Sequence, residues 1–338
     1  MLTLFRLFNN NKVGAISNYL LIFAVAMTYE ELCRRLYPLY EAGEAKAIVR
    51  YVLEVRFGLS LADILCGKMD GLPTSDQEEL EATMLRLETG EPVQYVLGVA
   101  DFCGRQFHVE PGVLIPRPET EELCRWIIKS EELRVKSEES CVLDIGTGSG
   151  CIAITLALEM PEAKVTAWDI SDDALRIAAE NAAALKAHVA FEHRDILASQ
   201  SHQSWGQAHS ALPQVPVPMT DVPGEADSSL FALHSSLSII VSNPPYIQPS
   251  ERAAMARNVL DFEPQLALFA PADEPIIFYQ RIGDFAWQNL IDGGELYFEL
   301  NPLTAIQVRD YLRGLGFSDI EIRDDQFGKP RFLKAKKI

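Results

Sequence analysis

The sequence lacks the residue patterns of metal and disulfide sites. Its six cysteines form no Cys-x-x-Cys pair and show no regular spacing, and its six histidines include no His-Glu-x-x-His pair. Zinc sites and disulfide frameworks depend on such spacings. We therefore predict no metal site, and we expect the protein to work in a reducing compartment, the cytoplasm.

Positive charge and long apolar runs are also scarce. The chain carries 30 Lys and Arg against 48 Asp and Glu, a formal net charge of −18. Because affinity for nucleic acid comes mainly from clustered Lys and Arg, this balance argues against direct binding of long nucleic acid. The apolar run at 19–27 is too short to span a bilayer, so we expect no membrane partner.

Residues 1–26 are treated as a separate N-terminal extension. Their apolar run follows Arg6 and Lys12, in the manner of a weak signal peptide. However, Met27 stands directly before an acidic helix start at 28–32. We expect translation to start at Met27, with a true targeting segment as the alternative.

A chain of 338 residues can form one large α/β domain and a smaller partner. Residues 27–90 have helical periodicity, with Leu80, Met84 and Leu87 on one stripe, and predict a small helical bundle. Residues 91–114 contain two short β-like runs, at 93–99 and 105–109, and predict a β-hairpin linker.

From residue 115 to 338 strands and helices alternate, which is typical of a doubly wound parallel sheet. The expected strands are 141–145, 164–169, 189–193, 237–241, 295–300 and two more near Ile320 and Phe332. Helices are expected at 151–160, after Ser171, at 275–291 and at 304–315. Residues 199–233 lose all periodicity and predict a mobile surface insertion.

A glycine-rich run, Gly146-Thr147-Gly148-Ser149-Gly150, follows the first buried strand and opens a helix. Three glycines in five residues allow a ligand to approach the backbone closely. A purely structural turn rarely needs so many glycines, so we favour a cofactor site over a tight turn. The run lacks the Gly-Lys-Ser/Thr ending of a P-loop.

Two acidic residues end the next two strands. Asp169 ends the second strand, where a carboxylate can accept hydrogen bonds from both hydroxyls of a ribose. The alternative is that Asp169 caps the following helix, although Ser171 can do that. Asp195 and Ile196 follow the third strand, where the same architecture places an adenine. Both NAD and S-adenosylmethionine fit these features, so they leave the reaction open.

The fourth strand leads into Asn243-Pro244-Pro245-Tyr246, at the strand end where open α/β sheets bind ligands. The Asn243 side-chain oxygen and the Pro244 carbonyl can each accept one N–H of a planar NH₂ group. Tyr246 can pack flat on that group, and the prolines remove backbone freedom. This predicts methyl transfer from S-adenosylmethionine to a planar nitrogen, rather than a simple proline turn.

The sequence resembles the class I methyltransferases, and in particular the release factor glutamine methyltransferase (PrmC/HemK) family, from about residue 28 onward. The resemblance rests on the glycine-rich run, Asp169 and residues 243–246, and on further segments at 90–98, 115–121 (Ile-Pro-Arg-Pro-Glu-Thr-Glu), 262–264, 267–268 and Gly328. It implies a Rossmann-like domain with a mostly parallel seven-stranded sheet and helices on both faces, preceded by a helical bundle domain and the β-hairpin linker.

The resemblance also implies a reaction and a partner. The cofactor would be S-adenosylmethionine, bound by residues 146–150, Asp169, Asp195, Ile196 and Asn243. The substrate would be the glutamine of the Gly-Gly-Gln loop in class 1 peptide chain release factors, methylated on its side-chain nitrogen. Arg117, Glu119 and Thr120 would shape the glutamine pocket, although Glu119 and Thr120 could simply begin a helix.

Three other functions stay open at this point. Asn-Pro-Pro-Tyr also occurs in nucleic-acid adenine methyltransferases, which flip their base into such a site, and in the ribosomal-protein glutamine methyltransferase. The net charge of −18 and the segment 117–121 argue against the nucleic-acid substrate. A non-catalytic binding module is the third possibility, which the intact 243–246 segment disfavours.

Overall fold

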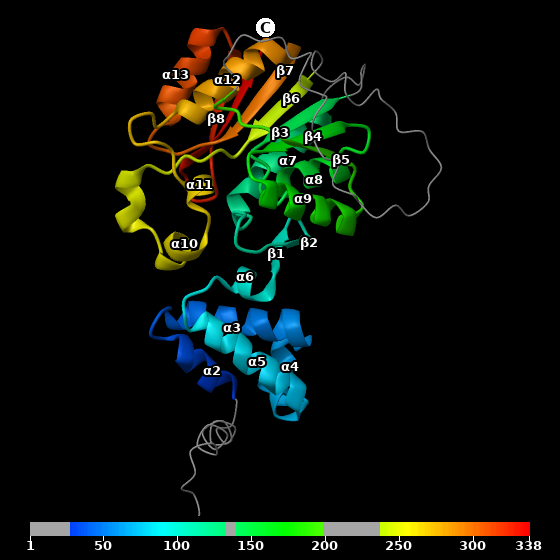
Figure 1. Cartoon of the computed structure of the whole chain (residues 1–338), viewed down its shortest axis with the longest axis vertical. Coiled ribbons are helices and arrows are strands. Elements are labelled where there is room, and N and C mark those ends of the chain that lie inside the picture. Colours follow the sequence, from blue (N-terminus) through cyan, green and yellow to red (C-terminus); the bar gives the residue numbers. More distant parts are fainter. Residues whose placement is uncertain (1–27, 133–139, 199–236) are drawn as a thin grey trace, which may run out of the picture. The chain divides into compact units, whose positions relative to one another are not determined.

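The computed structural model describes residues 28–132, 140–198 and 237–338. The predictions for 1–26 and 199–233 lie outside these residues. The chain forms two compact units, Met1–Leu97 and Gly98–Ile338, which are described separately (Figure 1). No helix in the described ranges is both long enough and apolar enough to cross a bilayer.

The first unit is helical. Its elements are α2 Tyr29–Leu36, α3 Ala42–Phe57, α4 Leu61–Leu65, η1 Lys68–Gly71, α5 Thr74–Leu87 and α6 Val93–Leu97. The predicted stripe of Leu80, Met84 and Leu87 is fully buried. Arg35 of α2 forms ion pairs with Glu81 in α5 and with Glu88 directly after α5, at 2.6 and 2.5 Å.

The predicted strand at 93–99 is wrong, because residues 93–97 form helix α6. Pro92 precedes the helix, and its carbonyl accepts a helical hydrogen bond from the Val96 amide at 3.0 Å. Arg86 of α5 donates to the carbonyls of Tyr95 and Val96, at 3.3 and 3.1 Å. These contacts outweigh the β propensity of the valines.

The second unit begins with a hairpin of β1 Val99–Phe102 and β2 Arg105–His108. Its two turn residues, Cys103 and Gly104, have φ of 49° and 73°. Two left-handed residues in a two-residue loop match the twist of paired strands. The predicted hairpin is therefore present, but it is confined to residues 99–108.

The main sheet of the second unit has seven strands in the order β5-β4-β3-β6-β7-β9-β8. Their bounds are β3 Cys141–Ile145, β4 Lys164–Asp169, β5 Val189–His193, β6 Leu237–Ser242, β7 Leu290–Glu299, β8 Ser318–Asp324 and β9 Pro330–Lys336. Strands β3 to β7 pair in parallel, and β9 runs antiparallel between β7 and β8. This is the predicted seven-stranded, mostly parallel sheet.

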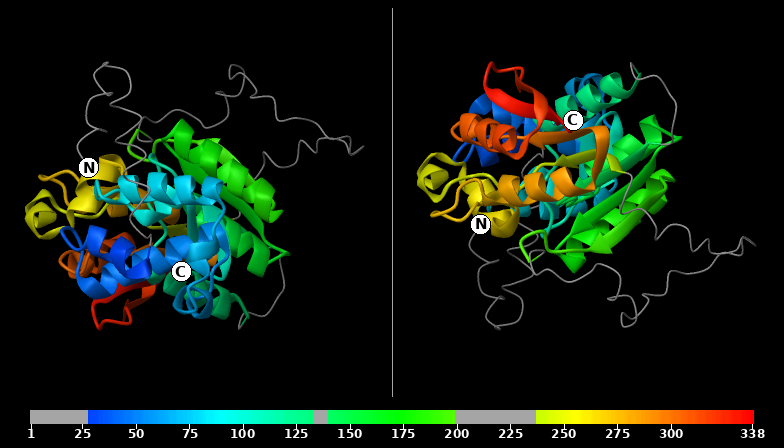
Figure 2. Two further views of the ribbon diagram at one scale, coloured as in Figure 1. Left: turned by 90° about the horizontal axis from the view of Figure 1, so that it is seen from below. Right: turned by 90° about the horizontal axis from the view of Figure 1, so that it is seen from above.

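Helices cover both faces of this sheet. On one face lie α7 Pro118–Glu132, α8 Cys151–Glu159 and α9 Asp172–Leu185, and on the other α12 Ile277–Asn289 and α13 Ala305–Leu315 (Figures 1 and 2). Along β3, Val142 packs in the core that contains α7, α8 and α9, and Leu143 packs in the core that contains α12 and α13, because side chains alternate between the two faces of a strand. The short elements η3 Pro249–Ala254, α10 Arg257–Phe262 and α11 Gln265–Leu268 follow β6.

The strand order reverses between β3 and β6. From β3 the chain continues outward to β4 and β5, and it then returns to β6 on the other side of β3. In open α/β sheets the crevice at such a reversal, beyond the carboxyl ends of the strands, is where ligands bind. The glycine-rich run follows β3 and residues 243–246 follow β6, so the fold brings both motifs to this crevice.

Candidate functional site

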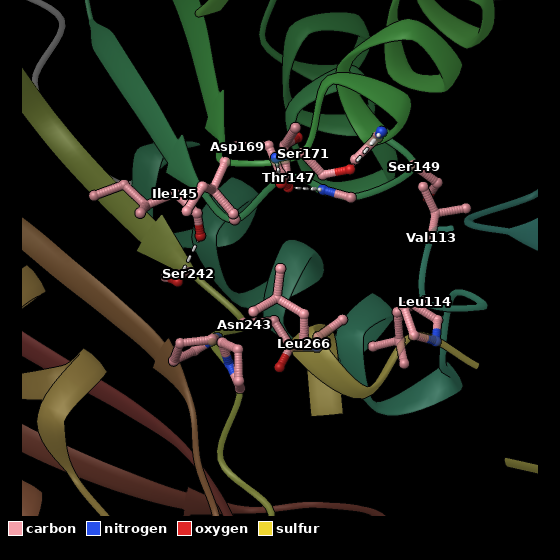
Figure 3. A pocket seen from close by; sticks show the side chains of 18 of the residues that line it. Val113, Leu114, Ile145, Thr147, Ser149, Asp169, Ser171, Ser242, Asn243 and Leu266 are labelled. Atoms are coloured by element: carbon pink, nitrogen blue, oxygen red, sulfur yellow. Dashed lines mark hydrogen bonds between the residues drawn. The ribbon is translucent and has the colours of Figure 1, made fainter. Parts of the chain in front are cut away.

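A cavity of about 380 Å³ lies at this crevice. Figure 3 shows Thr147, Asp169 and Ser171 along one side, Asn243 and Leu266 along the opposite side, and Val113 and Leu114 at a third. The lining includes the cofactor residues that the sequence predicted except Gly150, together with Pro244, Pro245, Arg117 and Thr120. Glu119 and Tyr246 are not part of the lining.

The glycine-rich run forms a turn that is pinned to β4. The amides of Gly146 and Thr147 both donate to the Trp168 carbonyl, at 2.8 and 3.0 Å. Gly148 has φ of 56°, and a Cβ built there would meet no atom within 4 Å. The turn therefore leaves free space beside its backbone, as a closely approaching ligand requires.

Asp169 holds this turn in place. One carboxylate oxygen accepts from the Gly148 amide and the other from the Ser171 amide, both at 2.9 Å. Ser171 caps α9 through its own hydroxyl, which accepts from the Ala174 amide at 3.2 Å. Burial raises the pKa of Asp169. Each oxygen retains a second lone pair, so the carboxylate can still accept from a ligand hydroxyl.

The wall after β5 contains one residue that the sequence reading missed. Asp195 and Ile196 line the cavity as predicted, and the Asp195 carboxylate accepts from the Leu197 amide at 2.8 Å. Arg194 lines it as well, with its guanidinium 5.9 Å from the centre of the Trp168 ring. Its position directly after strand β5, beside Asp195, was the sequence signal that could have identified Arg194 as a cavity residue.

Asp144 is a second missed residue, buried beneath the glycine turn. Its Oδ2 accepts from the Thr147 hydroxyl at 2.7 Å, and its Oδ1 has no hydrogen-bond partner among the described residues. Burial raises the pKa of Asp144 to about 7. An acid as the fourth residue of a buried strand, two positions before Gly146, was the signal for it.

The opposite wall is the segment after β6. The Ser242 hydroxyl donates to the Ile145 carbonyl at 2.6 Å, which ties the ends of β6 and β3 together. Asn243, Pro244 and Pro245 then line the cavity. The Asn243 side-chain Nδ2 donates to the hydroxyl of Thr120 at 3.3 Å.

Tyr246 points its hydroxyl at a buried carboxylate. The hydroxyl donates to Glu299, the last residue of β7, at 2.9 Å. Burial raises the pKa of Tyr246 well above its usual value. Its predicted packing against the target group stays a prediction.

Arg117 and Thr120, at the start of α7, each contact a buried carboxylate. Arg117 forms an ion pair of 2.5 Å with Glu263, whose side chain is 1% exposed and also accepts from the Ile115 amide at 3.2 Å. Thr120 donates to Glu299 at 2.7 Å. Glu119 and Thr120 do begin the helix, and Thr120 reaches the site as well.

Across the described part of the chain, no group of three or more His, Cys, Asp and Glu side chains could hold a metal ion. The polar groups that face the cavity are instead carboxylates, backbone amides and carbonyls, an amide side chain and two guanidinium groups.

Comparison with known proteins gives the family. A model of the PrmC N-terminal domain matches residues 38–98, and a methyltransferase domain model matches residues 136–207. The chain is 39% identical to a release factor glutamine methyltransferase of Bacteroides thetaiotaomicron over 89% of this chain and 96% of that protein. It is 33% identical to one from Flavobacterium psychrophilum, over 90% and 96% of the two chains. This chain belongs to the release factor glutamine methyltransferase family.

Proposed function

We propose that this chain transfers the methyl group of S-adenosylmethionine to the side-chain amide nitrogen (N5) of the glutamine in the Gly-Gly-Gln motif of class 1 peptide chain release factors. The single observation that carries the proposal is the placement of Asn243 and Pro244 across one cavity from the glycine turn and Asp169. The names of the relatives agree with it. Since release factors act on ribosomes, the enzyme would work in the cytoplasm.

The cavity residues fit the cofactor. The open space beside Gly148 allows close approach to the backbone, and Asp169 can accept from ribose hydroxyls. Beneath the glycine turn, Oδ1 of Asp144 has no hydrogen-bond partner among the described residues, so it can still take part in a hydrogen bond. Asp169 and Asp195, which line the cavity, also suit a ligand that carries positive charge. When bound, S-adenosylmethionine supplies a methyl group on a cationic sulfur, which is an electrophile.

On the substrate side, the difficulty lies in the amide nitrogen, whose lone pair is delocalised. The Asn243 side-chain oxygen and the Pro244 carbonyl can each accept one N–H of the glutamine amide. Two acceptors fix the plane of the amide and favour a nitrogen whose lone pair points at the methyl group. Pro245 limits the backbone freedom of this wall. The proton that the nitrogen loses can leave to solvent after transfer.

The test is methyl transfer from labelled cofactor to a purified release factor. We expect label on the wild-type factor and none on a factor whose Gly-Gly-Gln glutamine is changed to alanine. Equal labelling of the two factors would refute the proposal. Parallel reactions with DNA, RNA and ribosomal protein test the two alternative substrates, and label on one of them alone would replace the release factor.

A further inference from the structure

The side chain of Asn243 stands at the end of a chain of buried hydrogen bonds. Its Nδ2 donates to the Thr120 hydroxyl at 3.3 Å, and that hydroxyl donates to Oε2 of Glu299 at 2.7 Å. The other Glu299 oxygen accepts from Tyr246 at 2.9 Å. Thr120 and Glu299 are only 2% and 1% exposed, so water cannot easily replace these bonds.

The direction of these bonds is set at the Glu299 end. An ionised carboxylate can only accept, so both hydroxyls that contact Glu299 must donate to it. A threonine hydroxyl carries one hydrogen. Once that hydrogen points to Glu299, the Thr120 oxygen can only accept from its other neighbour. The group of Asn243 that faces Thr120 must therefore be the NH₂, and the amide oxygen lies on the opposite side of the group.

The charge on Glu299 has support from its surroundings. Burial raises the pKa of Glu299, whereas the two hydroxyl donors and the nearby positive charge of Arg331 favour the carboxylate. Arg331 itself is held by Asp325 at 3.2 Å and by the Leu300 carbonyl at 3.2 Å. The carboxylate is thus buried among fixed donors.

We propose, on the basis of the function proposed above, that Thr120 and Glu299 are positioning residues that orient the Asn243 amide and thereby select glutamine over glutamate. The nitrogen and oxygen of an asparagine amide have nearly the same shape, so packing alone does not distinguish the two orientations. With the oxygen toward the substrate, Asn243 and the Pro244 carbonyl are two acceptors. They accept the NH₂ of glutamine and repel the carboxylate of glutamate.

Replacing Thr120 separates this role from packing. Thr120→Val keeps the shape and removes the hydroxyl, so Asn243 can turn its NH₂ toward the substrate. We expect kcat/KM for the release factor to fall roughly 10- to 100-fold, with unchanged affinity for S-adenosylmethionine. Thr120→Ser keeps the hydroxyl and should restore most of the activity.

A matched control is available in Thr155→Val. Thr155 is fully buried in α8, and its hydroxyl has no hydrogen-bond partner among the described residues. This variant makes the same chemical change in the same unit, outside the cavity lining. Its kcat/KM and its substrate preference should equal those of the wild type.

The decisive readout is the affinity for two release factors that differ only in glutamine or glutamate at the Gly-Gly-Gln position. The wild type should prefer glutamine, and the preference should shrink at least several-fold in Thr120→Val and in Glu299→Gln. The variant that combines Thr120→Val and Glu299→Gln should lose little more of the preference for glutamine than either single variant, because the two residues act through one chain of hydrogen bonds. A wild-type preference retained in Thr120→Val would overturn the proposal.

The same experiment separates two kinds of failure. If the wild type does not methylate the release factor, the proposed function fails, and selection of glutamine fails with it. If the wild type is active and Thr120→Val has the same preference and the same kcat/KM, only the positioning role fails.

Discussion

Asn243 is the residue in this site that should act on the substrate far more than on the cofactor. Asn243→Ala removes an acceptor for the target amide, so we expect methyl transfer to fall at least ~100-fold. The affinity for S-adenosylmethionine should change less than about threefold, because the glycine turn and Asp169 are intact. Single-turnover rates and equilibrium titration measure the two effects.

A control for this variant is Asn289→Ala. Asn289 ends α12, where its side chain donates to the Phe285 carbonyl at 2.8 Å. It does not line the cavity. Turnover should stay at the wild-type level in this variant. A loss of cofactor binding in Asn243→Ala as large as its loss of turnover would contradict the assignment of Asn243 to the substrate.

The raised pKa of Asp144 makes the stability of the protein depend on pH. The pKa of this carboxyl is about 3.8 in the unfolded chain, and burial raises it to about 7 in the folded protein. Between these values the folded state holds more protons, so the contribution of Asp144 to stability falls as pH rises, by about 1.4 kcal/mol per pH unit at most. Asp144→Asn removes this dependence.

The measurement is the free energy of unfolding without cofactor, near pH 5 and near pH 8. The stability of Asp144→Asn relative to the wild type should increase between the two. Asp273→Asn, at an exposed side chain, should show no such change. A wild-type pH dependence in Asp144→Asn would show that the buried carboxyl is not its source.

Single residues at the site were predictable when their motif follows a strand directly. The glycine-rich run, Asp169 and Asn243 all stand at strand ends in one stretch of sequence each. No contact or role was predicted for Glu299 or Glu263, because their partners are Thr120, 179 positions away, and Arg117, 146 positions away. Only the fold brings such pairs together, and an acid at the end of a buried strand was the one local sign of Glu299.

Among the elements, the packing of α8 against α9 depends on Gly150. This residue has φ of 82°, and a Cβ there would lie 2.8 Å from the Ile154 side chain and 3.1 Å from Ala178 Cβ. Gly150→Ala therefore adds backbone strain and overpacking, and we expect it to lower the free energy of unfolding by about 2–4 kcal/mol. Thermal or denaturant unfolding measures this.

Gly314→Ala is the matched control in α13 of the same unit. A Cβ at Gly314 would meet nothing within 4 Å, and its φ is in the ordinary range. Because alanine favours helix more than glycine does, this variant should be more stable by about 0.5–1 kcal/mol. An unchanged free energy of unfolding in Gly150→Ala would contradict this expectation, because it would mean that α8 and α9 can move apart without loss of stability.

The regular elements followed from local patterns to different degrees. Strands β3, β4 and β5 begin and end where the sequence predicts, because short apolar runs there are bounded by polar residues and turns. Strand β7 is longer than predicted, because it begins at Leu290, inside the helix predicted at 275–291. Helix α6 was predicted as a strand, and its hydrogen bonds with Arg86 decide the outcome.

For the whole molecule, the first unit coincides largely with the region that matches the PrmC N-terminal domain model. The family resemblance implies that this helical unit contacts the release factor, which stays a prediction. The net charge of −18 agrees better with a protein substrate than with a long nucleic acid. The net charge therefore favours a protein as the substrate.

The proposed reaction places one methyl group on one glutamine of a release factor. The most direct measurement is mass-spectrometric mapping of the factor after incubation with this protein and S-adenosylmethionine. We expect a single added methyl group on the side-chain nitrogen of the Gly-Gly-Gln glutamine, and no added methyl group with Asn243→Ala. A methyl group on any other residue, with that glutamine unmodified, would contradict it.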